Sequence, residues 1–233
     1  MPSMPALCPV PTAPSLTSLS LTHVQFDPAD KLAYLLAYIT LSPLAILAAY
    51  ASTILARREI AAIVMLAGQL VCELLNATLK EVLQETRPCD HLGKGYGMPS
   101  SHAQFAWYFS TYLLLYTYTR ITVDNTIWKH LLAIVAISFS VVVSYSRIYL
   151  GYHTLTQVIY GASFGVCFAV FWYTFTEHVI RPQGWFSWAV QHPWGKLFYL
   201  RDSRDIPNVA RWEYQLYEAE IKAKRTKVEK KRK

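Results

Sequence analysis

The chain has 233 residues, of which 53% are hydrophobic and 14% aromatic, and its formal net charge is +7. This length allows one domain with a large core or two small domains. The hydrophobic fraction is high for a soluble protein and comes in blocks, which disfavours a soluble α-helical protein with buried helices. Four cysteines are too few for a disulfide framework in a chain of this size.

Five apolar blocks predict an all-α, multi-span transmembrane helical bundle. Each block approaches the ~20 residues that a helix needs to cross a ~30 Å hydrocarbon layer. The third block is the shortest, and the second carries Gln69, Glu73 and Asn76, so the second fits a spanning helix least well. The blocks comprise residues 32–55, 60–79, 103–118, 128–146 and 155–177.

The chain divides into three predicted parts. Residues 1–30 form a flexible leader that lacks the positively charged start of a secretory signal. Residues 31–180 form the transmembrane domain, and residues 181–233 form an interfacial segment with a basic tail. In this tail, "EAEIKAKRTKVEKKRK", charges of both signs alternate. A cytosolic, membrane-flanking role fits the tail better than nucleic-acid binding. We therefore expect the membrane as its partner and no nucleic acid, and we identify no protein partner.

Basic residues predict how the chain is oriented. The pair Arg57–Arg58 follows the first block, Arg120 and Lys129 flank the turn after the third, and the basic tail follows the fifth. If all five blocks cross, these residues share one face, which the positive-inside rule places in the cytosol. The last four residues also resemble the dilysine address of endoplasmic-reticulum membrane proteins. The leader 1–30, the loop 86–101 and the turn 147–154 would then face the lumen.

The first candidate segment, "LKEVLQETRP", carries Lys80 and Arg87. Seven residues make two helical turns, so the two side chains are expected to share a helix face about 10.5 Å apart. The same face continues through Asn76, Glu73 and Gln69, and polar groups inside a span usually face a partner or a cavity. A snorkelling lysine and a boundary arginine would also explain the pair.

The second candidate segment, "GYGMPSSHAQF", places Ser100, Ser101 and His102 at the start of the third block. A helix N-terminus leaves about four backbone N–H groups without partners, which suits it to bind an anion. The alternative is an N-capping serine followed by an incidental histidine. The nearby "GKGYG" lacks the Gly-Lys-Ser/Thr and the preceding strand of a nucleotide-binding loop, which excludes that function.

The third candidate segment, "SRIYLGYHTLTQ", carries Arg147, His153 and Gln157. By itself it could be a topology-marking arginine and an interfacial histidine. Two spans separate the second segment from the third, so both emerge on the same face. Together the three segments gather three cations, two serines and two histidines, which suits a tetrahedral anion with several charges. No carboxylate pair is placed to hold Mg²⁺. The set supports phosphoryl transfer without metal, and we expect no cofactor.

The three segments resemble the signature of the type 2 phosphatidate phosphatases, whose phosphate site is shared with vanadium haloperoxidases. That signature is Lys-x6-Arg-Pro, Pro-Ser-Gly-His and Ser-Arg-x5-His-x3-Asp. Here it reads Lys80…Arg87-Pro88, Pro99-Ser100-Ser101-His102 and Ser146-Arg147…His153…Gln157, with every internal spacing kept. Ser101 replaces the family's glycine and Gln157 its aspartate. The same two replacements are typical of the dolichyl-diphosphate phosphatase branch, which the later "LRDSRDIPNVARWEYQ" also resembles.

The resemblance implies a role for each residue. His153 would be the nucleophile that forms a phosphohistidine, and His102 the general acid and base. Gln157 would orient His153 without supplying charge, which suits a diphosphate because its leaving group is a phosphate monoester anion. The phosphate-binding residues would be Lys80, Arg87, Ser100, Ser101 and Arg147, completed by backbone N–H groups.

The resemblance also implies an activity. The chain would hydrolyse dolichyl diphosphate to dolichyl phosphate and phosphate on the luminal side of the endoplasmic reticulum, and so recycle the lipid carrier of protein N-glycosylation. One alternative is a broader lipid-phosphate phosphatase acting on phosphatidate, lysophosphatidate or other prenyl diphosphates. Another is an inactive membrane scaffold or transporter on the same fold.

Overall fold

The structure is a computed structural model that describes residues 17–19, 24–27, 29–89, 92 and 95–232. Most of the predicted leader, together with Lys233 at the end of the dilysine-like address, lies outside these residues. Within the described part, helices dominate, and a short antiparallel pair, β1 (Thr17–Leu19) and β2 (Val24–Phe26), precedes them. The predicted all-α class is thus confirmed.

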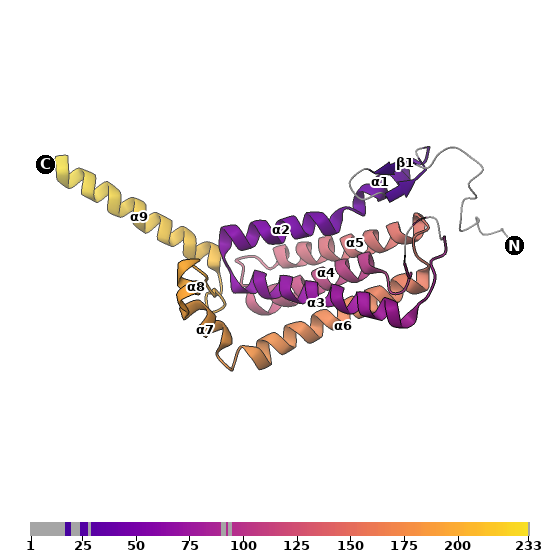
Figure 1. The fold of residues 1–233 in the computed structure, drawn as a ribbon. Coiled ribbons are helices and arrows are strands. Elements are labelled where there is room, and N and C mark those ends of the chain that lie inside the picture. Colours follow the sequence, from indigo (N-terminus) through magenta and orange to yellow (C-terminus); the bar gives the residue numbers. More distant parts are fainter. Residues whose placement is uncertain (1–16, 20–23, 28, 90–91, 93–94, 233) are drawn as a thin grey trace.

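Five long helices lie side by side and form the body of the molecule (Figure 1). They are α2 (Ser42–Arg57), α3 (Ile60–Leu83), α4 (Ser101–Arg120), α5 (Ile127–Tyr149) and α6 (Leu155–Phe175). The short α1 (Lys31–Ile39) leads into α2, and the π-helix η2 (Thr176–Ile180) extends α6. The chain ends in α7 (Trp185–Gln191), α8 (Pro193–Leu197) and α9 (Val209–Arg232).

Four helices of the described chain are long and apolar enough to cross a membrane. They cover residues 31–57, 60–83, 127–149 and 155–180. The second block was expected to fit least well, but it forms α3 and meets the criterion. The third predicted block, which forms α4, is not among these four helices. It packs against α2, α3, α5 and α6, so its many hydroxyl and amide side chains are covered by neighbouring helices rather than by lipid.

Two glycines on α6 allow it to approach α4 closely. A Cβ atom at Gly161 would lie 2.5 Å from the Ser100 carbonyl oxygen, and one at Gly165 would lie 2.4 Å from the Gln104 carbonyl oxygen. Real side chains do not tolerate such contacts, so residues spaced four apart on α6 must both be glycine for this packing. The close approach fixes the start of α4 against the start of α6.

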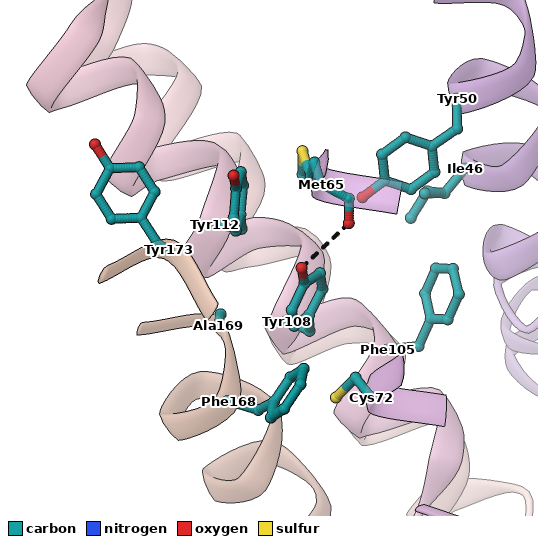
Figure 2. Close-up of a cluster of buried hydrophobic side chains, with 10 residues drawn as sticks. All are labelled: Ile46, Tyr50, Met65, Cys72, Phe105, Tyr108, Tyr112, Phe168, Ala169 and Tyr173. Atoms are coloured by element: carbon teal, nitrogen blue, oxygen red, sulfur yellow. Dashed lines mark hydrogen bonds between the residues drawn. The ribbon is translucent and has the colours of Figure 1, made fainter. Parts of the chain in front are cut away.

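The main core surrounds the middle of α4 (Figure 2). Tyr108 is completely buried, and its hydroxyl donates a hydrogen bond of 3.1 Å to the Met65 carbonyl oxygen of α3. Its ring packs near Tyr112 and Phe168, with centroid distances of 6.0 Å in both cases. Tyr50 of α2 adds a further buried ring. This aromatic core holds α2, α3, α4 and α6 together and so keeps the ends of these helices in register.

Part of the segment expected to be a flexible leader is folded instead. Val24 and Phe26 of β2 are buried in a second apolar cluster with Leu36 of α1. The Gln25 N–H donates a hydrogen bond of 2.7 Å to the hydroxyl of Tyr152, which lies in the turn between α5 and α6. Alternating apolar residues give β2 one face to bury, and α1 and this turn supply the surface that buries it.

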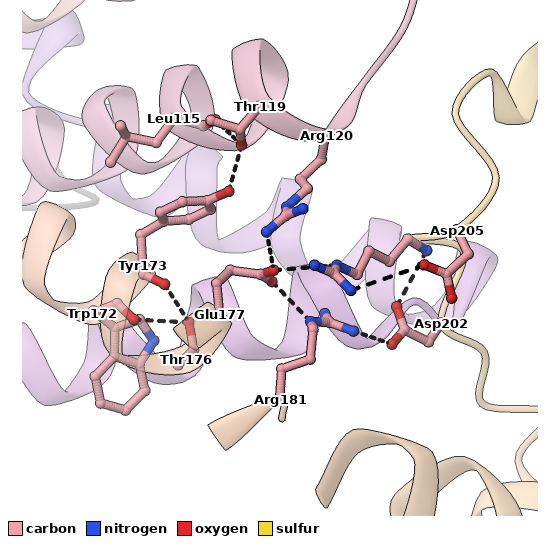
Figure 3. A network of polar contacts seen from close by, with 11 residues as sticks. Leu115, Thr119, Arg120, Trp172, Tyr173, Thr176, Glu177, Arg181, Asp202 and Asp205 are labelled. Atoms are coloured by element: carbon pink, nitrogen blue, oxygen red, sulfur yellow. Dashed lines mark hydrogen bonds and ion pairs between the residues drawn. The ribbon is translucent and has the colours of Figure 1, made fainter. Parts of the chain in front are cut away.

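The C-terminal segment is attached to the end of the bundle opposite this turn (Figure 1). We call this end, with residues 57–60, 120–127 and 177–209, the tail end. Buried Glu177 forms ion pairs with Arg120, Arg181 and Arg204 (Figure 3). Arg181 also pairs with Asp202. These contacts join the end of α4, the π-helix and the segment that follows α8.

Candidate active site

The predicted site residues meet at the other end of the bundle, where α3 ends and α4 and α6 begin. We call it the site end, and it comprises the described residues within 80–102 and 147–157. The Lys80 ammonium donates a hydrogen bond of 2.8 Å to the Ser101 hydroxyl, which links α3 to α4. The Ser100 N–H donates one of 3.1 Å to the Gln157 carbonyl oxygen, which links α4 to α6. Three segments distant in the sequence therefore converge.

Arg87 reaches the site from a loop and not from the helix that carries Lys80. The expectation that the two share one helix face is wrong, because α3 ends at Leu83. Gln84 adopts a left-handed conformation (φ 49°) and caps α3 by donating its N–H to the Lys80 carbonyl oxygen. The Arg87 Nε donates to the Gly95 carbonyl oxygen at 3.2 Å, and partial burial lowers the pKa of the guanidinium.

Arg147 is the most deeply buried cation of the site, with 4% of its surface exposed. It lies in the last turn of α5, and its Cζ lies 4.3 Å from the centroid of the Tyr152 ring. Two of its donors, Nε and Nη1, have no hydrogen-bond partner among the described residues, and neither does the buried Ser100 hydroxyl. Leaving buried donors unpaired costs ~1–3 kcal/mol each, and more for charged groups. The arrangement is therefore suited to an anion that contacts these donors.

His153 is held in one tautomer by the backbone. Its Nδ1 lies 2.9 Å from the Gly97 carbonyl oxygen. A carbonyl only accepts hydrogen bonds, so Nδ1 carries the proton and Nε2 keeps its lone pair. Burial, followed by the charges of Arg147, Arg87 and Lys80, lowers the pKa of His153 to about 3. The imidazole is consequently neutral near pH 7 and has a nucleophilic nitrogen available.

The side chain of Gln157 contacts four residues of the site end. Its Oε1 lies 3.3 Å from the His153 Nδ1 and accepts from the Thr154 N–H at 3.3 Å, as part of the capping box that starts α6. Its Nε2 donates to the Glu85 carboxylate at 3.0 Å and to the Thr86 carbonyl oxygen at 2.8 Å. Gln157 therefore contacts His153 as predicted, but the Gly97 carbonyl oxygen is the closer partner.

His102 lies in the first turn of α4 and is partly exposed. Its ring is placed against the backbone of Thr40, between α1 and α2. It also interacts electrostatically with Arg147 and with His153. The two histidines therefore share the neighbourhood of the buried arginine, as an acid–base group and a nucleophile for one ligand would require.

Sequence reasoning missed several residues that build this site. Gly97 supplies the carbonyl that fixes His153, and a Cβ there would lie 2.7 Å from the Gln157 amide nitrogen. Tyr152 supports Arg147, and Glu85 anchors Gln157. Only the glycine-rich composition around Gly97 marked this stretch in the sequence. The described residues contain no group of three His, Cys, Asp or Glu side chains that could hold a metal ion.

A helical membrane bundle that gathers three cations, a helix N-terminus and two histidines defines the class of phosphate-binding membrane enzymes. The chain belongs to the PAP2 superfamily, whose family model matches residues 59–181, a range that includes every site residue predicted from the sequence.

Among curated proteins, the chain is 38% identical to Dolichyldiphosphatase 1 of Rhinolophus ferrumequinum and 37% identical to that of Homo sapiens, with 95% of each chain covered. It is 33% identical to Dolichyldiphosphatase of Saccharomyces cerevisiae, over 88% of this chain and 89% of the yeast protein. A solved structure, the PAP2 type phosphatidylglycerolphosphate phosphatase from Bacillus subtilis, matches with a TM-score of 0.56 and 24% identity, over 66% of this chain and 80% of that one. This last likeness supports the fold alone.

Proposed function

We propose that this chain is a dolichyldiphosphatase that hydrolyses dolichyl diphosphate to dolichyl phosphate and inorganic phosphate. One observation carries the proposal: buried Arg147, two of whose donors find no partner in the described part of the chain, lies in electrostatic contact with the neutral His153. Such a pair suits a phosphoryl group, which brings the missing negative charge and can accept a nucleophile. The names of the curated relatives support dolichyl diphosphate as the substrate.

The proposed reaction has two steps and involves no metal. The His153 Nε2 attacks the terminal phosphorus, the bond from phosphorus to the bridging oxygen breaks, and dolichyl phosphate leaves as a phosphohistidine forms. His102 gives a proton to the leaving oxygen. It then takes a proton from the water that attacks the phosphohistidine, which releases phosphate and restores His153.

The contacts of the site explain how the chain would assist both steps. The Gly97 carbonyl oxygen and the Gln157 Oε1 face the His153 Nδ1–H, so they stabilise the positive charge that the ring acquires on attack. Lys80, Arg87 and Arg147 would neutralise the phosphoryl oxygens, with the Ser100 hydroxyl as a further donor.

The proposed orientation puts the site end in the lumen of the endoplasmic reticulum and the C-terminus in the cytosol. It is supported by the basic residues of the tail end, including Arg57, Arg58 and Lys196. Trp188 and Trp194 of α7 and α8 are 60% and 64% exposed, as expected for a segment that lies at a membrane interface. The site end would then meet diphosphate released on the luminal side, and the enzyme would recycle the lipid carrier of N-glycosylation.

The substrate and the mechanism can be tested on the purified full-length protein with EDTA present. We expect phosphate release from dolichyl diphosphate to exceed release from phosphatidate, and a His153→Ala variant to be inactive. Equal rates on phosphatidate would contradict the proposed substrate and favour a broader lipid phosphatase. Loss of activity in EDTA would contradict the metal-free mechanism.

The orientation needs a separate experiment in sealed microsomes. Cysteines introduced at the exposed positions Thr86, at the site end, and Lys196, at the tail end, would be treated with an impermeant thiol reagent. We expect labelling at position 196 without detergent and at position 86 only after detergent. The opposite pattern would place the site in the cytosol.

A further inference from the structure

A line of hydrogen bonds runs from the interior of the bundle to Lys80. Gln104 of α4 and Asn76 of α3 are almost completely buried, with 0% and 1% of their surfaces exposed. The Asn76 Nδ2 donates to the Gln104 Oε1 at 2.5 Å, and the Ser101 hydroxyl donates to the Asn76 Oδ1 at 2.9 Å. The Ser101 oxygen accepts from the Lys80 ammonium at 2.8 Å. We call these four side chains the Lys80 relay.

The direction of every bond in the Lys80 relay follows from its inner end. There the Gln104 Nε2 donates to the Cys72 carbonyl oxygen at 2.7 Å. Because this carbonyl can only accept, the Gln104 Oε1 must face Asn76, and the Asn76 amide group must present its oxygen to Ser101. The Ser101 hydroxyl therefore donates its proton to the Asn76 Oδ1, and its oxygen accepts a hydrogen bond from the Lys80 ammonium. A backbone carbonyl within α3 thus determines where the ammonium is held.

We propose that Asn76 and Gln104 are positioning residues, which hold the Lys80 ammonium through Ser101 in the place where it binds the phosphoryl group. This inference rests on the proposed function only in that Lys80 binds phosphate. It also changes the role of Ser101, which supports Lys80 rather than donating its own proton to the phosphate. A glycine at position 101 has no hydroxyl and could not make this link.

The charges around Lys80 explain why it needs such support. Lys80 is within electrostatic range of Arg87 and Arg147, which repel it. It is also within range of the Glu73 carboxyl, which attracts it from a different direction along α3 than Ser101. A lysine has a flexible four-carbon stem, and ordering that stem on each encounter with substrate would oppose binding. Hydrogen bonds among buried groups keep the stem ordered before the anion arrives, which is the advantage of a preorganised site.

The same helix offers a matched control. Gln69 lies seven residues before Asn76, on the same face of α3, and is also completely buried. Both of its amide atoms lack hydrogen-bond partners among the described residues. Replacing Gln69 by leucine therefore makes the same chemical change at similar depth without touching the Lys80 relay.

The test measures the KM of a hydrolysed lipid phosphate and the inhibition constant of inorganic phosphate for purified full-length variants. We expect Asn76→Leu and Ser101→Ala to raise both constants roughly tenfold, the effect of losing a hydrogen bond to a charged group. Ser101→Thr keeps the hydroxyl and should raise both constants much less than Ser101→Ala does. Gln69→Leu should change either constant by less than about twofold.

A double-mutant cycle distinguishes positioning from a purely structural role. If Asn76 acts through Lys80, then Asn76→Leu should have almost no further effect in a Lys80→Met protein, so the two changes are not additive. An equal effect of Asn76→Leu with and without Lys80 would overturn the proposal. So would an equal effect of Gln69→Leu and Asn76→Leu in the wild-type background.

Asn76→Leu leaves the Gln104 Oε1 unpaired and could prevent folding. The Asn76→Leu/Gln104→Leu double variant removes both partners, which is far less disruptive than removing one. We expect it to elute as a single species and to show the same weakened phosphate inhibition, and wild-type inhibition would overturn the proposal. The cycle uses whichever lipid phosphate the enzyme hydrolyses, so a failed dolichyl diphosphate assay would contradict the proposed function and leave this test intact.

Discussion

The two ends of the bundle both bury arginine side chains, but among the described residues only the tail end pairs them with carboxylates. At the tail end, Glu177 is 6% exposed and pairs with Arg120, Arg181 and Arg204 (Figure 3). At the site end, none of the three cations, Lys80, Arg87 and Arg147, forms an ion pair with a described residue.

This difference shows how one residue type serves stability in one place and binding in another. A buried charge is costly unless a charge of opposite sign accompanies it. Glu177 meets that requirement within the chain, so the tail end is a structural contact. Arg147 lacks such a partner within the described chain, which is why we propose that the site end binds an anion.

The largest expected effect comes from removing the unpaired arginine. Arg147→Met should lower phosphate release by about 10³-fold, since one donor to the transition state contributes up to this much. The melting temperature should be unchanged or higher, because an unpaired buried charge is removed. Activity and thermal melting of the purified variant measure both. Arg120→Met at the tail end is the matched control and should melt at a lower temperature but retain turnover.

Removing the central carboxylate of the tail end should have the opposite outcome. Glu177→Gln leaves three guanidinium groups without their shared partner and should destabilise the protein by about 3 kcal/mol. Folded protein should still hydrolyse substrate at a rate near that of the wild type. Melting curves and activity per folded molecule test this. A large loss of turnover in Glu177→Gln would show that the two ends are not independent.

The site end should also make the stability of the protein depend on pH, because it holds a neutral histidine beside cations. The pKa of His153 is lowered to about 3, below its ordinary value of about 6.5. As pH falls, the unfolded chain therefore binds this proton before the folded protein does. The contribution to stability is complete above pH ~6.5 and is lost as pH falls towards 3.

We therefore expect the melting temperature to decrease from pH 7 to pH 5, and His153→Asn to reduce that decrease. Arg147→Met should reduce it as well, because it removes one of the charges that lower the pKa of His153. An unchanged pH profile in both variants would show that burial and charge at the site end do not control this histidine.

The smallest expected effect comes from adding a carboxylate to the site end. Gln157→Asp should keep activity on the diphosphate and raise the relative rate on monophosphates a few-fold, because a negative charge steadies the imidazolium of His153. Gln157→Asn has the same length without the charge and isolates that effect. Both shorter side chains lose the hydrogen bonds that Gln157 makes to Glu85 and Thr86, so both variants should melt at a lower temperature. Equal substrate selectivity of the two would contradict the argument.

Local sequence determined where the long helices lie along the chain and which residues could form the site, although it misplaced Arg87 on a helix. Hydropathy blocks correspond to α2, α3, α5 and α6 because a spanning helix needs a long apolar run wherever its neighbours lie. Pro88 and Pro99 indicated a loop at the site end, because proline breaks a helix and disfavours the helical conformation of the residue before it. Lys80, His102, Arg147 and His153 could thus be singled out by type and spacing alone.

Only the tertiary structure decided which of these groups have partners. Asn76 and Gln69 look equivalent on the polar face of α3, yet Asn76 meets Gln104, 28 residues away, and Gln69 meets no partner within the described chain. The Gln157 amide likewise depends on Glu85, 72 residues away. Such pairings follow from how closely α4 approaches α6 and α3, and a periodic pattern along one helix carries no information about that distance. The same holds for the contrast between Glu177 and Arg147, because charge balance in a buried site depends on neighbours brought together from the whole chain.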